Sequence, residues 1–372
     1  NKFRALIGKT STSVIKEIEE NFPHLPLGCS VNLERKAKEI ILKNISAATS
    51  LNRLQLILKI QNFRHQTSLP LNLKNFLEFY KIPLQSIYKR GGWNRLCQIA
   101  GVVEEFDDLN EKPIVSAIGN KWLSTKSTSY FKFILDLATN NFQVNPEEVN
   151  KEEGLMLLML HYDIWQKEGG FNSLRDSISE IGKNKVLLGE IIEVLDFLID
   201  QIDFKELNIN LPYKQPLKVH SRYTRDQILA GFGLSTFDKK SSSREGVALN
   251  PKLNTELLFI NLIKSDENFS STTMYDDYAI NEILFHWQSQ NSAGPETTKG
   301  LSYIKHRENN RRILLFVREK VKDEYGNTMG YVFVGEGNLN DYYGSKPMSV
   351  KWELSEPLPH YLWKDAAKLR VG

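Results

Sequence analysis

The spacing of apolar residues changes once along this chain, and that change indicates the class of fold. Before about Phe204 the apolar residues recur at helical spacing, most clearly from Glu152 to Gln166. Between Leu207 and Arg222 this spacing stops, and Asn, Pro and Lys accumulate. From Ser221 onward, short segments alternate apolar and polar residues as strands do. The sequence therefore predicts an α+β protein with an all-helical coupler domain at 1–206, a linker at 207–220 and a strand-rich domain at 221–372.

The helical part is predicted to contain helices near Leu33–Ile45 and Leu51–Ile60, followed by a compact group of three between Leu73 and Gly101. Pro83 and the pair Gly91-Gly92 separate the three helices of this group. Two interpretations stay open, a DNA-binding three-helix module and ordinary helical packing. The basic residues of the group, Lys89, Arg90 and Arg95, are few, which favours packing.

The strand-rich part is predicted to begin with a short helix, because Thr224 and Gln227 form a capping box. Five segments then predict strands, and a turn at 325–327 joins the third to the fourth. They are Leu257–Ile263, Glu282–Trp287, Arg312–Val321, Gly330–Gly335 and Met348–Leu354. Several short strands with flanking helices predict a small curved sheet or a partly open barrel.

Composition bounds the possible functions only broadly. The net charge of +3 permits nucleic-acid binding without arguing for it. Cys29 and Cys97 are the only cysteines, which excludes a disulfide framework and a cysteine-based zinc site and fits a cytoplasmic protein. The longest apolar run, Leu155–Leu160, is too short to cross a membrane, and the start shows no signal peptide pattern. Because the chain begins at Asn1 within a predicted helix, we expect it to be part of a longer protein.

The motifs of common nucleic-acid enzymes are missing from the sequence. No G-x-x-x-x-G-K-[ST] phosphate loop occurs, so a P-loop ATPase is excluded. Glu319 and Lys320 follow one another at the end of a predicted strand, without the Glu-x-Lys spacing of a restriction-type nuclease. His161, Asp163 and Glu168 have no second histidine one helical turn away, so a solvated helix end is the expected interpretation. We predict no catalytic residue, no metal site and no cofactor in this chain.

The segment from Tyr275 to Gln290 combines aromatic rings, acids, amides and a hydroxyl group. Rings can stack on a nucleobase, amides can bridge to its edge, and an aspartate can accept the exocyclic amino hydrogens of cytosine. Phe285 is expected in the core, while for Trp287 a core position and a stacking role are both open. The predicted base-binding residues are Tyr275, Asp276, Asp277, Tyr278, Trp287, Gln288, Ser289 and Gln290.

Basic residues before and after this segment are candidates for contacts with DNA phosphates, which would make affinity depend on salt. The alternative for each one is a solvated surface position. The predicted set is Arg222, Arg225, Arg244, Lys299, Lys305, Arg307, Arg311, Arg312 and Lys346.

Several strings in the strand-rich part resemble one known family. They are Tyr223–Leu229, Glu245–Val247, Phe285–Gln290, Leu315–Glu319, Tyr331–Gly335 and Gly344–Met348. Together they resemble the C-terminal domain of SauUSI-like type IV restriction enzymes, which join a phospholipase-D-like nuclease, a superfamily-2 helicase and a recognition domain. The resemblance covers about Ser221 to Trp363, and Phe285–Gln290 is its most specific part. The helical part is similar, more weakly, to the segment that follows the helicase core.

The resemblance implies a fold and a function. It implies a small SRA/PUA-like curved β-barrel that flips 5-methylcytosine or 5-hydroxymethylcytosine out of double-stranded DNA. This part of the protein would couple recognition to the helicase and nuclease domains of the same polypeptide, as in defence against phage. The full-length protein would then be an ATP- and Mg²⁺-dependent endonuclease, whereas this part would not be an enzyme. Two alternatives stay open, a module that docks motor and nuclease without recognising a base, and a hydrolase acting on nucleic acid.

Overall fold

The computed structural model describes residues 51–262, 277–323 and 325–363. They belong to two compact units. Unit 1 comprises the chain up to residue 123 together with 181–197 and 322–327, and unit 2 comprises 124–180, 198–321 and the residues from 328 onward. The predicted helix at Leu33–Ile45, Cys29, Tyr275 and Asp276 lie outside the described residues. The predicted domain limits 1–206, 207–220 and 221–372 stay a prediction.

Unit 1 is helical. Its helices are α4 (Arg53–Gln66), α5 (Leu73–Tyr80), α6 (Leu84–Tyr88), α7 (Trp93–Ile99), α8 (Glu111–Asn120) and most of α12 (Lys185–Asp200). Asn52 and Asn72 cap α4 and α5, because the side chain of each accepts a hydrogen bond from a backbone N–H three residues later. The rings of Phe76 and Trp93 are buried and lie 5.0 Å apart. The predicted group of three short helices between Leu73 and Gly101 is therefore confirmed.

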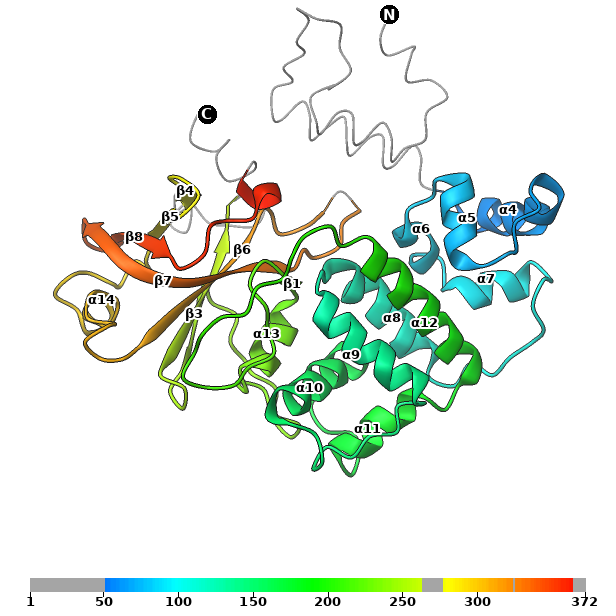
Figure 1. Ribbon diagram of the computed structural model, residues 1–372, viewed down its shortest axis with the longest axis horizontal. Coiled ribbons are helices and arrows are strands. Elements are labelled where there is room, and N and C mark those ends of the chain that lie inside the picture. The colour runs from blue at the N-terminus through cyan, green and yellow to red at the C-terminus, as the bar shows by residue number, and fades with distance from the viewer. Residues whose placement is uncertain (1–50, 263–276, 324, 364–372) are drawn as a thin grey trace, which may run out of the picture. The chain divides into compact units, whose positions relative to one another are not determined.

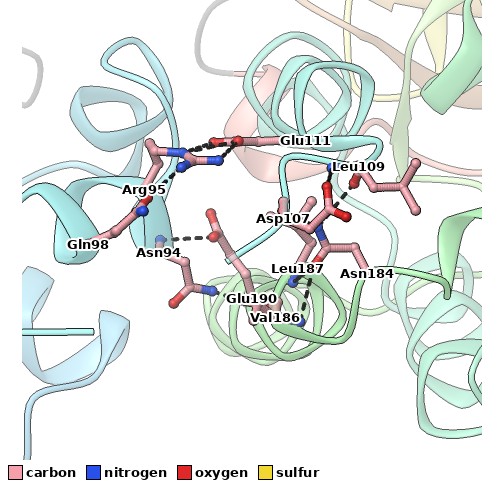
Figure 2. A network of polar contacts seen from close by, with 10 residues as sticks. All are labelled: Asn94, Arg95, Gln98, Asp107, Leu109, Glu111, Asn184, Val186, Leu187 and Glu190. Atoms are coloured by element: carbon pink, nitrogen blue, oxygen red, sulfur yellow. Dashed lines mark hydrogen bonds and ion pairs between the residues drawn. The ribbon is translucent and has the colours of Figure 1, made fainter. Parts of the chain in front are cut away.

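Two carboxylates of α12 cap helices that are distant in the sequence. The buried Glu190 accepts hydrogen bonds from the backbone N–H groups of Trp93 at 2.8 Å and Asn94 at 2.9 Å, where α7 begins (Figure 2 shows the bond from Asn94). Glu193 accepts from the N–H of Leu73 at 2.9 Å, where α5 begins. A negative charge at a helix N-terminus stabilises the unpaired N–H groups there. Helix α12 therefore fixes the start of both α5 and α7.

The basic residues of the three-helix group are engaged inside unit 1. Arg95 makes forked hydrogen bonds to Glu111 (Figure 2). Lys89 and Arg90 donate to backbone carbonyl oxygens of the same unit. Side chains that are held in this way favour ordinary helical packing over a DNA-binding module.

Unit 2 contains the remaining helices, α9 (Thr128–Thr139), α10 (Lys151–Trp165), α11 (Leu174–Ile181), α13 (Arg225–Gly231) and α14 (Thr298–Ile304). Helix α10 confirms the predicted helix at Glu152–Gln166, and Thr224 caps α13 through the predicted box with Gln227. Residues 207–220 pack into this unit, where Leu207 pairs with the buried Val219. Across the described ranges no group of three or more His, Cys, Asp or Glu side chains could hold a metal ion. No helix among those described is long and apolar enough to span a membrane.

Eight strands of unit 2 form one mixed sheet. They are β1 (Arg222–Tyr223), β2 (Val247–Asn250), β3 (Thr255–Asn261), β4 (Tyr278–Ala279), β5 (Leu284–Gln288), β6 (Arg312–Arg318), β7 (Tyr331–Tyr343) and β8 (Ser349–Leu354). The order is β2-β3-β6-β7-β8-β5-β4, and β1 pairs with the start of β7. Strands β3 and β6 are parallel, and the other pairs are antiparallel. All five predicted strands are present, as β3, β5, β6, β7 and β8.

The predicted barrel is wrong, because the sheet is open. Closing it would require β2 to pair with β4, and in the described part of the chain these two edge strands do not pair. Strand β4 has two residues, which is too little backbone to close a barrel. The long strand β7 instead joins the two halves of the sheet, because its first part pairs with β6 and its second part with β8 (Figure 1). The predicted α+β class is confirmed.

Apolar side chains cover both faces of this sheet. On one face Trp287 and Trp352 belong to a buried cluster that includes residues of β3, β5, β6, β7 and β8. On the other face Phe316 stacks on Phe333 at 4.6 Å with an angle of 13°, and on Phe259 at 5.7 Å. Alternation along the strands produces this division.

Candidate functional site

The predicted base-binding residues Asp277 and Tyr278, at β4, contact residues of β5. The ring of Tyr278 stacks on His286 at 4.6 Å with an angle of 20°, on the face of the β4–β5 pair that Trp287 does not occupy. Asp277 accepts a hydrogen bond from the backbone N–H of Gln288 at 2.9 Å. The sequence did not single out His286, although the alternation of β5 places it opposite Phe285 and Trp287.

Trp287 lies in the core of the sheet. Its side chain is 4% exposed. The ring of Tyr303 meets it edge-on at 5.1 Å, and Trp352 lies 6.3 Å away. An indole covered in this way presents no free face to a base, so its placement supports the core alternative.

Ser289 joins two strands. It is fully buried, and its Oγ accepts a hydrogen bond from the N–H of Met348 at 2.9 Å and donates to the carbonyl oxygen of Gln290 at 3.2 Å. These bonds tie the end of β5 to the start of β8. They also fix the backbone at Gln290, whose side chain points toward a second group of polar residues.

A buried carboxylate lies at the centre of that group, which we call the Glu256 cluster. Glu256 on β3 is 0% exposed and forms ion pairs with Lys299 on α14 and with Arg311, whose Nη1 lies 3.6 Å from Glu256 Oε2. The hydroxyl of Tyr303 lies 3.2 Å from Glu256 Oε1 and 3.0 Å from Gln290 Oε1. The cluster consists of Glu256, Gln290, Lys299, Tyr303 and Arg311.

One acceptor at the centre of the Glu256 cluster, Oε2 of Glu256, lacks a hydrogen-bond donor among the described residues. Tyr303 carries a single hydroxyl proton, so it can donate to Glu256 or to Gln290 but not to both. Burial and the neighbouring charge of Glu256 hold the pKa of the Tyr303 hydroxyl far above its usual value, so that proton stays in place. The cluster can therefore take up further hydrogen-bond donors.

Helix α14 positions two members of the cluster. Lys299 and Tyr303 lie four residues apart, on the same face of the helix, and both meet Glu256. Thr297 caps the helix and accepts from the N–H of Gly300 at 3.0 Å. Gly300 packs against the backbone of Gly294, where a Cβ would lie 1.9 Å from the carbonyl oxygen. This close approach holds α14 against the loop that follows Gln290.

The predicted phosphate-binding residues fall into two groups. Arg222, Arg312 and Lys346 form ion pairs with Glu319, Glu336 and Glu296, while Lys299 and Arg311 belong to the Glu256 cluster. Arg225 is half-buried and Arg244, Lys305 and Arg307 are exposed, and in the described ranges no carboxylate forms an ion pair with these four. The structure therefore joins the predicted residues Gln290, Lys299 and Arg311 around an acid that the sequence did not single out. The sequence did contain one indication of its role, because an acid directly before a dense apolar run is unusual.

Comparison with known proteins gives three results. Residues 217–366 match the model of a family described as "Domain of unknown function (DUF3427)". A comparison with curated proteins found no match. Among solved structures the chain is similar to "The 5-Hydroxymethylcytosine-Specific Restriction Enzyme AbaSI", with 16% identity and a TM-score of 0.24 over 51% of this chain and 57% of that one. The chain thus spans little more than half the length of that protein, and a TM-score this low carries no argument about function.

Proposed function

We propose that unit 2 recognises a cytosine-type base of double-stranded DNA, and that the Glu256 cluster receives the exocyclic amino group of that base. The buried oxygen Oε2 of Glu256, which has no hydrogen-bond donor among the described residues, carries this proposal. An amino group brings two hydrogens, one for Glu256 Oε2 and one for Gln290 Oε1 when Tyr303 donates to Glu256. Carboxylates accept from cytosine N4 in the same way in other DNA-binding proteins.

The burial of Glu256 supports recognition of a base that has left the double helix. A carboxylate that is 0% exposed is out of reach for the edge of a base that is still stacked in a duplex. Flipping costs a few kcal/mol, which hydrogen bonds in a protected site and phosphate contacts must offset. The side chains of Lys299 and Arg311, which pair with Glu256, are 34% and 22% exposed. A base would enter past these two cations, and both would then be available to its phosphates.

The finer parts of the proposal rest on the family resemblance of the strings around Phe285–Gln290. We take unit 2 to contain an SRA-like recognition domain, and the base to carry a 5-methyl or 5-hydroxymethyl group. The exposed Arg244, Lys305 and Arg307 would contact the DNA backbone. Recognition would be coupled to a helicase motor and a nuclease elsewhere in a full-length, ATP- and Mg²⁺-dependent restriction enzyme of the cytoplasm.

Fluorescence anisotropy with the whole chain tests the proposal. Labelled duplexes would carry one central cytosine, 5-methylcytosine or 5-hydroxymethylcytosine. Burial of one methyl group is worth about 0.8 kcal/mol, so we expect the methylated duplex to bind about fourfold more tightly than the unmodified one. Glu256→Gln keeps the shape of the side chain and replaces one acceptor oxygen by a donor, so it should weaken binding of all three duplexes.

The matched control is Glu353→Gln, which changes an exposed glutamate on β8 and should leave binding unchanged. Circular dichroism would show that both variants are folded. Equal binding of the wild type to all three duplexes, together with no effect of Glu256→Gln, would favour the docking module. Cleavage of DNA by the isolated chain would favour the hydrolase.

A further inference from the structure

Two arginines lie over aromatic rings on the sheet face opposite to the Glu256 cluster. Arg225 has its guanidinium carbon 3.8 Å from the ring centroid of Phe259, and Arg318 has its own 4.3 Å from that of Tyr331. The two rings meet edge to face at 5.2 Å. Phe259 and Glu256 are three positions apart on β3, and an odd spacing places their side chains on opposite faces of the sheet. Two cations thus flank one pair of rings, away from the proposed base site.

Both guanidinium groups donate their hydrogen bonds to uncharged groups. Arg318, which is 9% exposed, donates to the carbonyl oxygen of Met329 at 3.1 Å and to the side chain of Asn261. Arg225 donates to the carbonyl oxygens of Ser243 at 3.2 Å and of Glu245. In the described part of the chain neither arginine forms an ion pair. Carbonyl oxygens and rings stabilise a cation without cancelling its charge.

A third arginine nearby, Arg222, forms a forked ion pair with Glu319, at 2.8 Å for Nη1. Burial lowers the pKa of Arg318, and repulsion by Arg225 and Arg222 lowers it further. Burial lowers the pKa of Arg225 and the charge of Arg244 lowers it further, against the opposing effects of Tyr331 and Asp226. Uncompensated charge inside a protein is costly, so an anion at this position would stabilise it.

We propose that Arg225, Arg244 and Arg318 form a binding site for a phosphate group, separate from the base site on the other face of the sheet. Arg244 is exposed and Arg225 is half-buried, so an anion can reach them from solvent, and Arg318 strengthens the field beneath. One guanidinium group can donate two parallel hydrogen bonds to the oxygens of a phosphate. The phosphate can belong to the DNA backbone or be a free ion.

The loop between α13 and β2 supports phosphate as the ligand. Arg225 holds this loop through Ser243 and the carbonyl oxygen of Glu245, so Arg244 between them has a fixed backbone. The hydroxyl of Ser243, whose Oγ lies 3.3 Å from Arg225 Nη2, adds a donor beside that cation. A phosphate brings both negative charge and several acceptor oxygens, which matches this combination better than a carboxylate or chloride does.

Isothermal titration calorimetry with inorganic phosphate at constant ionic strength tests the site on the whole chain. We expect the wild type to bind phosphate, and Arg244→Gln to bind it about tenfold more weakly, the effect of one lost charged hydrogen bond. Arg318→Gln, which removes the charge beneath the site, should also bind phosphate more weakly than the wild type. The matched control is Arg175→Gln, which removes an exposed arginine from α11 and should bind like the wild type. If Arg318→Gln does not fold, Arg244→Gln decides, because an exposed side chain can be replaced without loss of the fold.

A second arm identifies the source of the phosphate. Duplex binding by Arg244→Gln is measured over a range of salt concentrations. A salt slope reduced by about 1 assigns the site to the DNA backbone, and an unchanged slope with weaker phosphate binding assigns it to a free ion. No heat with phosphate beyond that with chloride, or wild-type phosphate binding by both variants, would overturn the proposal. The phosphate arm uses no DNA, so its result is independent of base recognition.

Discussion

Replacing Trp287 distinguishes a core residue from a residue that stacks on a base. The indole is 4% exposed, and removing a buried tryptophan side chain costs about 3–5 kcal/mol. Its edge-to-face contact with Tyr303 at 5.1 Å and its contact with Trp352 at 6.3 Å account for about 0.5–1.5 kcal/mol each. We therefore expect Trp287→Ala to destabilise unit 2 by about 4 kcal/mol. Trp287→Phe, which keeps one ring, should cost less than half of that.

Urea denaturation followed by circular dichroism measures the effect. With a slope of about 2 kcal/mol per molar, a loss of about 4 kcal/mol lowers the midpoint by about 2 M. The control is Tyr342→Ala, which removes a ring that is 39% exposed and should cost about 1 kcal/mol or less.

An unchanged midpoint for Trp287→Ala, together with loss of DNA binding, would refute the core assignment. It would mean that the indole faces a ligand rather than Tyr303 and Trp352. A lowered midpoint with the graded order Ala, Phe, wild type would support the packing described here.

Three further predictions concern caps, packing and pH. Glu190→Gln leaves an N–H at the start of α7 without an acceptor and should weaken that helix by about 2 kcal/mol, seen as about 30-fold faster hydrogen exchange of its amides. Gly300→Ala would place a Cβ 1.9 Å from the carbonyl oxygen of Gly294, so we expect it to displace α14 and weaken DNA binding in anisotropy. Burial alone would raise the pKa of Glu319, but the charge and hydrogen bonds of Arg222 outweigh it and hold that pKa below 4.5. The stabilisation by this pair is therefore present above pH 4.5 and lost as pH falls through the lower, folded pKa; Glu319→Gln should flatten the acid limb of a plot of urea midpoint against pH.

Local signals were sufficient to predict most of the secondary structure. The capping box of Thr224 and the alternation of β5 each depend on a few neighbouring residues, and both are present in the structure. The closure of the sheet depends on which strands meet across long stretches of chain. The parallel pairing of β3 with β6 and the length of β7 have no local signature, and the predicted barrel is wrong for that reason.

The candidate site was predicted only in part, for a related reason. Gln290, Lys299 and Arg311 were singled out by residue type, but the sequence could not show that they converge on Glu256. That acid precedes an apolar run on β3, and its burial depends on α14 packing across the strand. Trp287 was expected either to stack on a base or to lie in the core, although its alternation with Phe285 already pointed to the core.

Exchanging 5-methylcytosine for thymine at one position of a duplex tests most directly whether the Glu256 cluster binds an amino group. The two bases share the methyl group, and thymine presents the acceptor O4 where cytosine presents the amino group. We expect the wild-type chain to bind the 5-methylcytosine duplex about tenfold more tightly or better, and Glu256→Gln, whose amide can donate to O4, to lose that preference. Equal affinity of the wild type for both duplexes, or a preference that survives in a folded Glu256→Gln variant, would contradict the assignment.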